Sequence, residues 1–262
     1  MDVVHCGVNM KNKLIAHKAN VFFRRKNLVE NFSLLTEIGV DILEIDVYQT
    51  KDNHFYISSD SRLYGKYFWN LKSNELIDLF SLESVIEHAI LNNLTLMLDL
   101  KSFPAFYSFD IKKILKLLNQ YDMNNHLNNF YIVSYDHNLI NTIKKEFENI
   151  NCGILFVGIL TNYNILSDIG ADFISTQTRF LTKKLINFIQ KEKLMLCGWA
   201  TTKSDDIDFL VKNNVSYLHC DTLEIIDYIK NNSIFAERYT NISKEFRDKL
   251  LKDIKYVKKY AK

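Results

Sequence analysis

The chain alternates short apolar runs with segments of helical periodicity, and this alternation constrains its fold more than any other feature. Eight apolar, strand-like runs recur at 14–17, 41–47, 94–100, 130–134, 153–157, 172–175, 194–199 and 215–220. Apolar residues at helical spacing lie between them, as in 29–39, 109–121, 138–147, 181–193 and 205–214. Strictly alternating strands and helices predict a parallel sheet, because parallel neighbours need a crossover connection.

Eight strand-helix units predict a closed (β/α)8 barrel, the α/β fold known as a TIM barrel. The competing architecture is a doubly wound open sheet, which usually carries a glycine-rich phosphate loop after its first strand. The stretch IAHKANVFF at 15–23 has no such loop. No linker or change of composition interrupts the chain after residue 14, so we expect one barrel domain over residues 1–232.

The last thirty residues, 233–262, differ from the rest of the chain. They hold nine Lys and Arg residues against four Asp and Glu. Apolar residues recur there at helical spacing, namely Phe246, Leu250, Leu251, Ile254 and Val257. This pattern predicts a basic amphipathic helix that packs on the barrel, and weak contact with an anionic membrane surface is the alternative use of its basic face.

The composition is that of an ordinary soluble globular protein, with 47% hydrophobic residues, 24% charged residues and a net charge of +2. It indicates neither nucleic-acid binding nor disorder. The four cysteines are widely separated and form no CxxC pair, so neither a zinc site nor a disulfide framework is predicted. No signal peptide and no apolar run of membrane-spanning length is evident, and we expect a soluble cytoplasmic protein.

Acidic side chains lie at the ends of two successive barrel strands. Alternation along the run DILEIDV at 41–47 sends its apolar residues toward the helices and sends Glu44 and Asp46 into the barrel. Asp99 and Lys101 share the corresponding face at the end of the next barrel strand. Active sites of (β/α)8 barrels are built at this carboxyl-terminal end, so these side chains are expected to meet there.

Carboxylates that converge at one mouth repel each other by about 3 kcal/mol per pair at ~5 Å and an effective dielectric of ~20. A hard divalent cation such as Mg²⁺ or Ca²⁺ would offset this repulsion, because it prefers oxygen ligands. His17 and Lys18 end the first strand and would stand beside the same mouth. A metal, a histidine and a lysine together suit stabilisation of a phosphoryl group and proton transfer to a leaving oxygen.

The order of these motifs resembles that of glycerophosphodiester phosphodiesterases, metal-dependent (β/α)8-barrel hydrolases. That family shows His-Arg-Gly, Pro-Glu-Asn, Glu-x-Asp, Thr-Lys-Asp-Gly, His-Asp and Glu-x-Lys in turn, then Trp-Thr and Thr-Asp. This chain shows HKA at 17–19, VEN at 29–31, EID at 44–46, TKDN at 50–53, SSD at 58–60, DLK at 99–101, GWATT at 198–202 and CDT at 220–222. The resemblance covers residues 14 to about 230.

The resemblance implies a role for each matching position. The implied metal ligands are Glu44, Asp46 and Asp99. The implied catalytic residues are His17 and Lys101, together with Ser59, which occupies a catalytic position of the family. The implied substrate contacts are Lys18 to phosphate and Trp199 in the substrate pocket, although a barrel-core position is the alternative for Trp199.

Three departures from the family pattern bear on activity. Lys18 in place of Arg keeps the charge and loses the bidentate fork. Asp99 in place of Glu is shorter, but the related spider-venom sphingomyelinase D group uses the same Asp-x-Lys. Ser59 stands where the family has its second histidine, and loss of a proton-transfer group costs roughly 10²–10⁴-fold in rate.

If the absence of a histidine at position 59 is compensated, another histidine must lie at the barrel mouth. We expect His219, at the end of the eighth strand, to neighbour His17 across the closing seam of the barrel, to contact substrate and to be the candidate substitute. His54 is a poor candidate because an odd separation from Ser59 directs it to the opposite face, and His137 reads as a helix start.

The resemblance therefore predicts a metal-dependent hydrolase. Its substrates would be glycerophosphodiesters or lysophospholipids, and its products glycerol 3-phosphate or lysophosphatidic acid and an alcohol. Reduced or altered activity is expected because of Ser59. The alternative is a catalytically weakened barrel that binds phosphodiesters in a regulatory role.

Overall fold

The computed structural model describes residues 13–21, 28–122, 126–199 and 203–231. The predicted C-terminal helix at 233–262 lies outside these residues, as do Cys6 and part of the GWATT motif. The domain boundary at residue 232 therefore stays a prediction.

Eight parallel strands close into a barrel, in the order β1-β11-β10-β9-β8-β7-β6-β2, with β1 also paired to β2. The strands are β1 (Lys13–Ala16), β2 (Ile42–Gln49), β6 (Leu96–Leu100), β7 (Phe130–Ser134), β8 (Asn151–Phe156), β9 (Phe173–Gln177), β10 (Met195–Trp199) and β11 (Tyr217–Cys220). Each predicted run forms one of these strands, and no end moves by more than two residues. The predicted (β/α)8 barrel is confirmed, and the doubly wound sheet is excluded by its closure.

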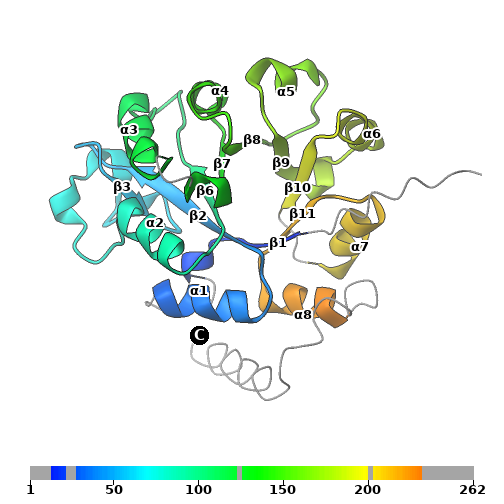
Figure 1. The fold of residues 1–262 in the computed structure, drawn as a ribbon, viewed down its shortest axis with the longest axis horizontal. Helices are drawn as coiled ribbons and strands as arrows, with labels where there is room; N and C mark the ends of the chain where they lie inside the picture. The colour runs from blue at the N-terminus through cyan, green and yellow to red at the C-terminus, as the bar shows by residue number, and fades with distance from the viewer. Residues whose placement is uncertain (1–12, 22–27, 123–125, 200–202, 232–262) are drawn as a thin grey trace, which may run out of the picture.

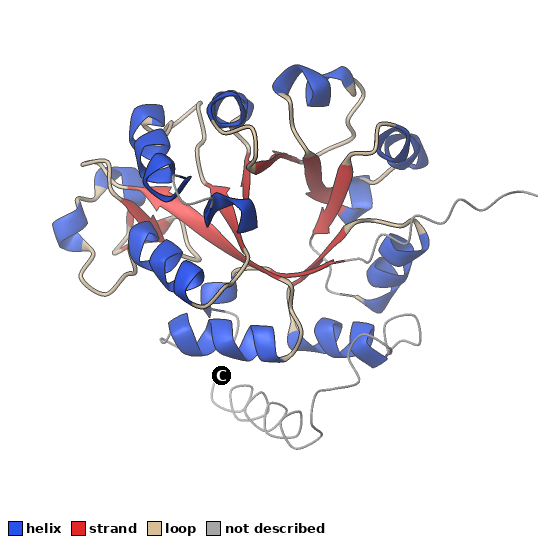
Figure 2. Ribbon diagram, in the orientation of Figure 1, coloured by secondary structure: helices blue, strands red, loops and turns tan. Residues whose placement is uncertain are grey.

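Helices surround the barrel (Figures 1 and 2). They are α1 (Leu28–Glu37), α2 (Leu82–Leu91), α3 (Ile111–Asp122), α4 (His137–Glu146), α5 (Asn164–Ile169), α6 (Lys183–Lys191), α7 (Ser204–Lys212) and α8 (Leu223–Asn231). Side-chain caps begin several of them, as where Asp136 accepts a hydrogen bond from the Leu139 N–H of α4. No helix among the described residues is long and apolar enough to cross a membrane.

An insertion separates β2 from α2. The chain turns back after β2 into β3 (Phe55–Ile57), which pairs antiparallel with β2. A small hairpin follows, formed by β4 (Arg62–Leu63) and β5 (Lys66–Tyr67). The short 3-10 helices are η1 (Ala19–Val21), η2 (Phe68–Asn70), η3 (Ser73–Glu75), η4 (His126–Asn129) and η5 (Thr178–Phe180).

The two faces of each barrel strand meet different surroundings. The outward residues of β2 lie in the core between strands and helices, as predicted. The inward residues of all eight strands fill the barrel interior with an apolar cluster of Ile15, Ile42, Met97, Tyr131, Val133, Leu155, Phe173, Cys197 and Tyr217. Polar residues follow two positions later on the same faces, so Glu44 follows Ile42 and Asp99 follows Met97. The apolar cluster is therefore the floor of a polar mouth.

Gly153 of β8 leaves room for the largest ring of this floor. It is paired in register with Phe173 of β9, and a Cβ atom on Gly153 would lie 2.2 Å from the Phe173 ring. Phe173 is fully buried and in contact distance of Tyr131 and Tyr217, with ring centroids 6.1 Å away in each case. The ring therefore has little space into which it can shift.

We predict that Gly153→Ala lowers the free energy of unfolding by about 1–3 kcal/mol, because it overpacks the barrel interior. Urea denaturation measures the change. The double variant Gly153→Ala with Phe173→Leu should recover part of the loss relative to the sum of the single changes, because the smaller side chain removes the clash. Simple additivity of the two changes would contradict this packing argument.

Candidate active site

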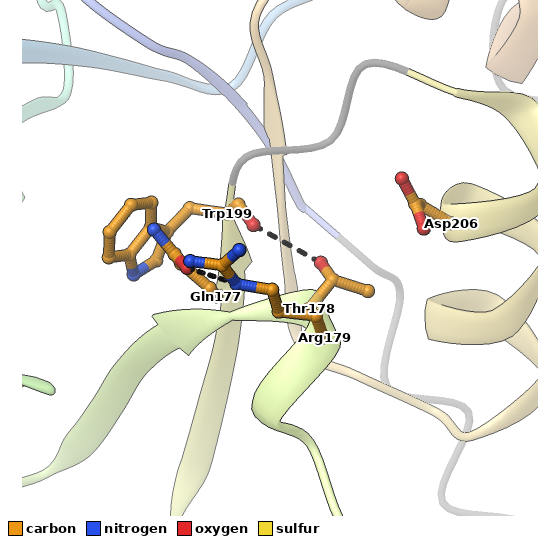
Figure 3. Close-up of a pocket in the computed structure, with 5 residues that line it drawn as sticks. All are labelled: Gln177, Thr178, Arg179, Trp199 and Asp206. Carbon is orange, nitrogen blue, oxygen red and sulfur yellow. Dashed lines mark hydrogen bonds between the residues drawn. The ribbon is translucent and has the colours of Figure 1, made fainter. Parts of the chain in front are cut away.

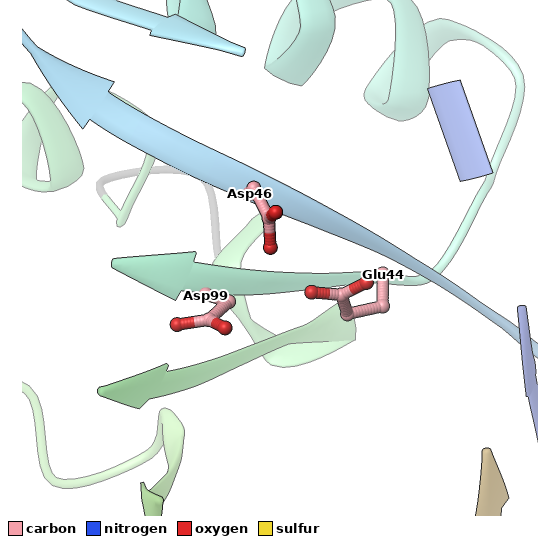
Figure 4. A group of neighbouring side chains, drawn as sticks. All are labelled: Glu44, Asp46 and Asp99. Atoms are coloured by element: carbon pink, nitrogen blue, oxygen red, sulfur yellow. The ribbon is translucent and has the colours of Figure 1, made fainter. Parts of the chain in front are cut away.

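Three carboxylates meet inside the barrel mouth (Figure 4). Glu44 and Asp46 come from β2 and Asp99 from β6, and the register pairs Asp46 directly with Asp99. One oxygen from each residue lies within 4.8 Å of the others, and all three residues are buried. The inward alternation of these two strands thus brings together the three acids that the sequence singled out.

Two lysines enter this acidic cluster. Lys101 Nζ lies 2.7 Å from Asp46 Oδ1 and also forms an ion pair with Asp99. Lys18 Nζ lies 3.3 Å from Asp46 Oδ2, and the Lys18 backbone N–H donates to Glu44 Oε2 at 2.7 Å. Both ammonium groups therefore partly balance the three negative charges.

The charge balance of the cluster shifts its protonation equilibria. Burial, followed by the charge of Asp46, raises the pKa of Glu44 to about 8. Burial also raises the pKa of Asp99 to about 6, although Lys101 opposes this shift. Burial acts to lower the pKa of Lys101, but Asp99 and Asp46 hold it well above its usual value. Burial therefore favours the protonated forms of Glu44 and Asp99, even with two lysines nearby.

The donor set fits a hard divalent cation. It offers oxygen ligands alone, which Mg²⁺ and Ca²⁺ prefer over nitrogen or sulfur. Asp99 Oδ1 is buried and has no hydrogen-bond partner within the described ranges, so it leaves a ligand position available. A cation would share these carboxylates with Lys101.

His17 is held beside the acids by Asp221. The register of β1 and β11 continues past their ends, since the His17 N–H donates to the Cys220 carbonyl, and His17 Nδ1 lies 2.5 Å from Asp221 Oδ1. Burial acts to lower the pKa of His17, but the Asp221 hydrogen bond and the charge of Glu44 raise it above its usual value. Asp221 thus fixes the ring through Nδ1.

His219 lies inside the barrel next to His17, as predicted from the closing seam. The two ring centroids are 5.8 Å apart, and in the part of the chain that the structure describes neither ring nitrogen of His219 has a hydrogen-bond partner. Burial, with the charges of His17 and Lys101, holds its pKa well below its usual value. His219 is therefore a neutral imidazole whose two nitrogens meet no hydrogen-bonding group of the described residues.

Ser59 borders the mouth through its backbone. Its carbonyl accepts a hydrogen bond from Lys18 Nζ at 2.7 Å, and the neighbouring Ser58 N–H donates to the Asp46 carbonyl. His54 is exposed and pairs with Asp52 at 3.6 Å, and His137 begins α4, as the sequence indicated for both. The serine therefore lies close to the acids while neither of these histidines replaces it.

A cavity of about 290 Å³ opens on the opposite side of the mouth (Figure 3). It is lined by Gln177, Thr178, Arg179, Trp199 and Asp206. The strands β9 and β10 that carry it lie across the barrel from β2 and β6. The indole of Trp199 packs on the apolar floor, and its Nε1 has no hydrogen-bond partner among the described residues. Trp199 therefore packs on the apolar floor and also lines this cavity, and its contact with substrate stays a prediction.

Two features of this site were missed in the sequence. Asp221 lies in the CDT motif, but no role was assigned to it, although its place directly after β11 pairs it with His17 directly after β1. Gln177, the last residue of β9, and Arg179, in η5, were not singled out, because that strand end carries no acid or histidine. Strand-end position on adjacent strands is the pattern that would have indicated Asp221.

Comparison with known proteins finds similarity both in sequence and in fold. No family model matches the chain. It is 21% identical over 244 residues to a glycerophosphodiester phosphodiesterase of Caldanaerobacter subterraneus, which covers 83% of this chain and 97% of that protein.

Solved structures show the same barrel. A glycerophosphodiester phosphodiesterase from Parabacteroides distasonis has a TM-score of 0.71 at 18% identity, covering 87% of this chain and 98% of that one. A phosphodiesterase from Oleispira antarctica, in complex with the product sn-glycerol-3-phosphate, has a TM-score of 0.72 at 15% identity, covering 84% and 97%. The resemblance to glycerophosphodiester phosphodiesterases predicted from the motif order is confirmed, in sequence along most of the chain and in fold.

Proposed function

We propose that this chain is a metal-dependent phosphodiesterase that hydrolyses glycerophosphodiesters to glycerol 3-phosphate and an alcohol. One observation carries the proposal. The carboxylates of Glu44, Asp46 and Asp99 meet beside His17 and Lys101, in a barrel that is similar to those of glycerophosphodiester phosphodiesterases. The complex of the Oleispira neighbour with sn-glycerol-3-phosphate supports the product class.

The cation site and the two lysines would bind the phosphate of the substrate. A divalent cation held by the three carboxylates would polarise a phosphoryl oxygen and neutralise developing charge. Lys101 and Lys18 point their ammonium groups into the same cluster, where they would attract the phosphate and stabilise charge on its oxygens. Binding and orientation of the phosphate thus rest on both strand ends.

His17 is the proton-transfer group of the proposed reaction. Because Asp221 engages Nδ1, the second nitrogen, Nε2, is the one left to exchange a proton with the substrate. Asp221 is then a positioning residue that also stabilises the charged imidazolium, as a carboxylate behind a histidine does in hydrolases generally.

Trp199 and His219 are the proposed contacts for the rest of the substrate. Each carries a buried ring nitrogen that no described residue pairs with, and burial of an unpaired polar group costs free energy until a ligand or water satisfies it. Hydroxyl groups of a glycerol moiety suit these nitrogens. A lysophospholipid, whose product would be lysophosphatidic acid, fits the same headgroup chemistry.

Ser59 limits the proposed activity. It stands at the position of the family's second histidine, and a serine hydroxyl does not transfer protons near neutral pH. This observation also favours the second candidate function, a barrel that binds phosphodiesters and turns them over too slowly to be an enzyme.

We predict that Mg²⁺ or Ca²⁺ at about 100 times its Kd raises the melting temperature by about 5 °C or more, because binding only to the folded state stabilises it by about 2.7 kcal/mol. Asp99→Asn should abolish the shift. Asp60→Asn removes an exposed carboxylate of the same mouth and should leave the shift intact. An equal shift in Asp99→Asn would contradict the assignment of the metal ligands.

We predict that Asp221→Asn lowers the pKa of His17, because the substitution keeps the side-chain shape and removes the charge that holds the imidazolium. Nuclear magnetic resonance titration of the histidine rings in the presence of a chelator measures this. Since the folded-state pKa is raised, the pair stabilises the fold below the ordinary value of about 6.5, and this contribution disappears as the pH rises through the raised pKa. An unchanged His17 titration in Asp221→Asn would show that the carboxylate does not act on the ring.

We predict that the wild-type protein hydrolyses glycerophosphocholine slowly and p-nitrophenyl phosphodiesters much faster, because p-nitrophenolate leaves without protonation. Ser59→His should raise turnover of glycerophosphocholine by about 10²-fold or more and change the activated substrate little. His17→Ala should impair both. Steady-state kinetics with the two substrates separate these effects.

His219→Ala is the matched variant for the leaving-group experiment. If His219 substitutes for the missing histidine, its removal should lower glycerophosphocholine turnover further. Efficient wild-type turnover of glycerophosphocholine that His219→Ala leaves undiminished would show that Ser59 is not the limiting change.

A further inference from the structure

Large apolar side chains are exposed on the loops that surround the mouth. Phe106, in the loop after β6, is 84% exposed, and Ile159 and Val157, in the loop after β8, are 62% and 48% exposed. Both loops leave the carboxyl ends of their strands, which is the end where the acids lie. An isolated exposed apolar residue needs no explanation, but a set around one opening indicates an interaction surface.

The loop after β6 holds its apolar tip in the solvent. Phe103 and Tyr107 form an antiparallel bridge, and the N–H groups of Phe106 and Tyr107 both donate to the Phe103 carbonyl. Pro104, Ala105 and Phe106 lie between them, and all three are exposed. The tip is a closed turn made of apolar residues, so its backbone bonds hold Phe106 in an exposed position.

Aromatic rings connect this loop to the insertion after β2. Tyr67 stacks on Trp69 with centroids 4.4 Å apart, and Trp69 stacks on Tyr107 at 5.3 Å. On the other side of the tip, Phe103 stacks on Tyr135 at 6.1 Å. Half-buried tyrosine and tryptophan rings are typical of proteins at a membrane interface, where one part of the ring meets hydrocarbon and the other meets polar groups.

Two arginines at this end of the barrel are free to meet phosphate. The Arg62 guanidinium lies 4.1 Å from the Tyr67 ring centroid and donates to the Tyr67 hydroxyl, and Arg179 Nε donates to Gln177 Oε1 at 2.7 Å. Neither has a carboxylate partner among the ion pairs of the described chain. A guanidinium group matches the geometry of phosphate oxygens, so the charges complement a phospholipid headgroup layer.

We propose that these apolar loop tips, with the aromatic stack and the two arginines, dock the barrel mouth on a phospholipid surface from which the site takes a lysophospholipid. The inference rests on the proposed function, because it names the source of that site's substrate. A protein partner on the same rim would cover the entrance to the acids, whereas a lipid surface supplies the substrate through it. The apolar tips enter the acyl boundary while the arginines meet phosphates.

Co-sedimentation with phosphatidylcholine vesicles that contain lysophosphatidylcholine tests the docking without any catalysis. Zwitterionic lipid reduces attraction of the basic C-terminal segment. The double variant Phe106→Ser with Ile159→Ser should lower vesicle partitioning by about tenfold or more, since it removes two large apolar side chains from contact with lipid. Leu91→Ser is the matched control, because Leu91 is also 84% exposed but ends α2 at the opposite end of the barrel.

Kinetics on two forms of substrate complete the experiment. The double variant should hydrolyse water-soluble glycerophosphocholine at the wild-type rate and vesicle-held lysophosphatidylcholine about tenfold more slowly. The docking proposal is overturned if the wild type does not bind the vesicles. It is also overturned if the double variant binds them as strongly as the wild type, or if Leu91→Ser loses as much binding as the double variant. If the wild type hydrolyses neither substrate with metal present and the vesicle-binding pattern is intact, the proposed activity and the lysophospholipid substrate are overturned, while the docking surface stands.

Discussion

The buried ion network of Lys101 with Asp46 and Asp99 is the interaction on which the candidate site depends. Two acids and one base from neighbouring strands lie inside a barrel, where a lone charge would be strongly destabilised. Their pairing is dictated by register, because Asp46 of β2 stands opposite Asp99 of β6 and Lys101 follows two residues later on the same face. Among the ion pairs of the described residues Lys101 has none with Glu44, and the pKa of Glu44 is raised further than that of Asp99.

The apolar floor below this network determines how the acids behave. An apolar residue stands two positions before each of the polar groups, on the same inward face: Ile42 before Glu44, Met97 before Asp99 and Ile15 before His17. The inward face of each strand is therefore apolar first and ionisable at its carboxyl end. Water is excluded from below, and the electrostatic interactions among the groups above are correspondingly strong. The same exclusion leaves His219 neutral and its nitrogens unsatisfied.

The barrel could be predicted well because its strands and helices are each indicated by a local pattern of residues. Period-2 apolar runs and helical spacing indicate elements directly, and alternation on 41–47 and 94–100 sufficed to place Glu44, Asp46 and Asp99 on the inner face. Helices α2, α5 and α8 and the insertion with β3 to β5 were not singled out. Contacts between distant segments were also missed, such as Asp221 with His17, which lie 204 residues apart, and Trp69 with Tyr107. The contact of Asp221 with His17 depends on barrel closure and follows only once β1 and β11 are taken as neighbours, whereas the contact of Trp69 with Tyr107 depends on loop packing, which no local pattern encodes.

Lys18 shows how the end of β1 joins the two halves of the site. Its φ of 51° lies in the left-handed region, which costs a non-glycine residue of order 1 kcal/mol or more. That turn directs its backbone N–H to Glu44 and its ammonium to Asp46 and to the Ser59 carbonyl. One residue thus links β1, β2 and the insertion, while the preceding His17 reaches β11 through Asp221. Because glycine would adopt the same turn without supplying the ammonium, the strained conformation is retained for the side chain that it places.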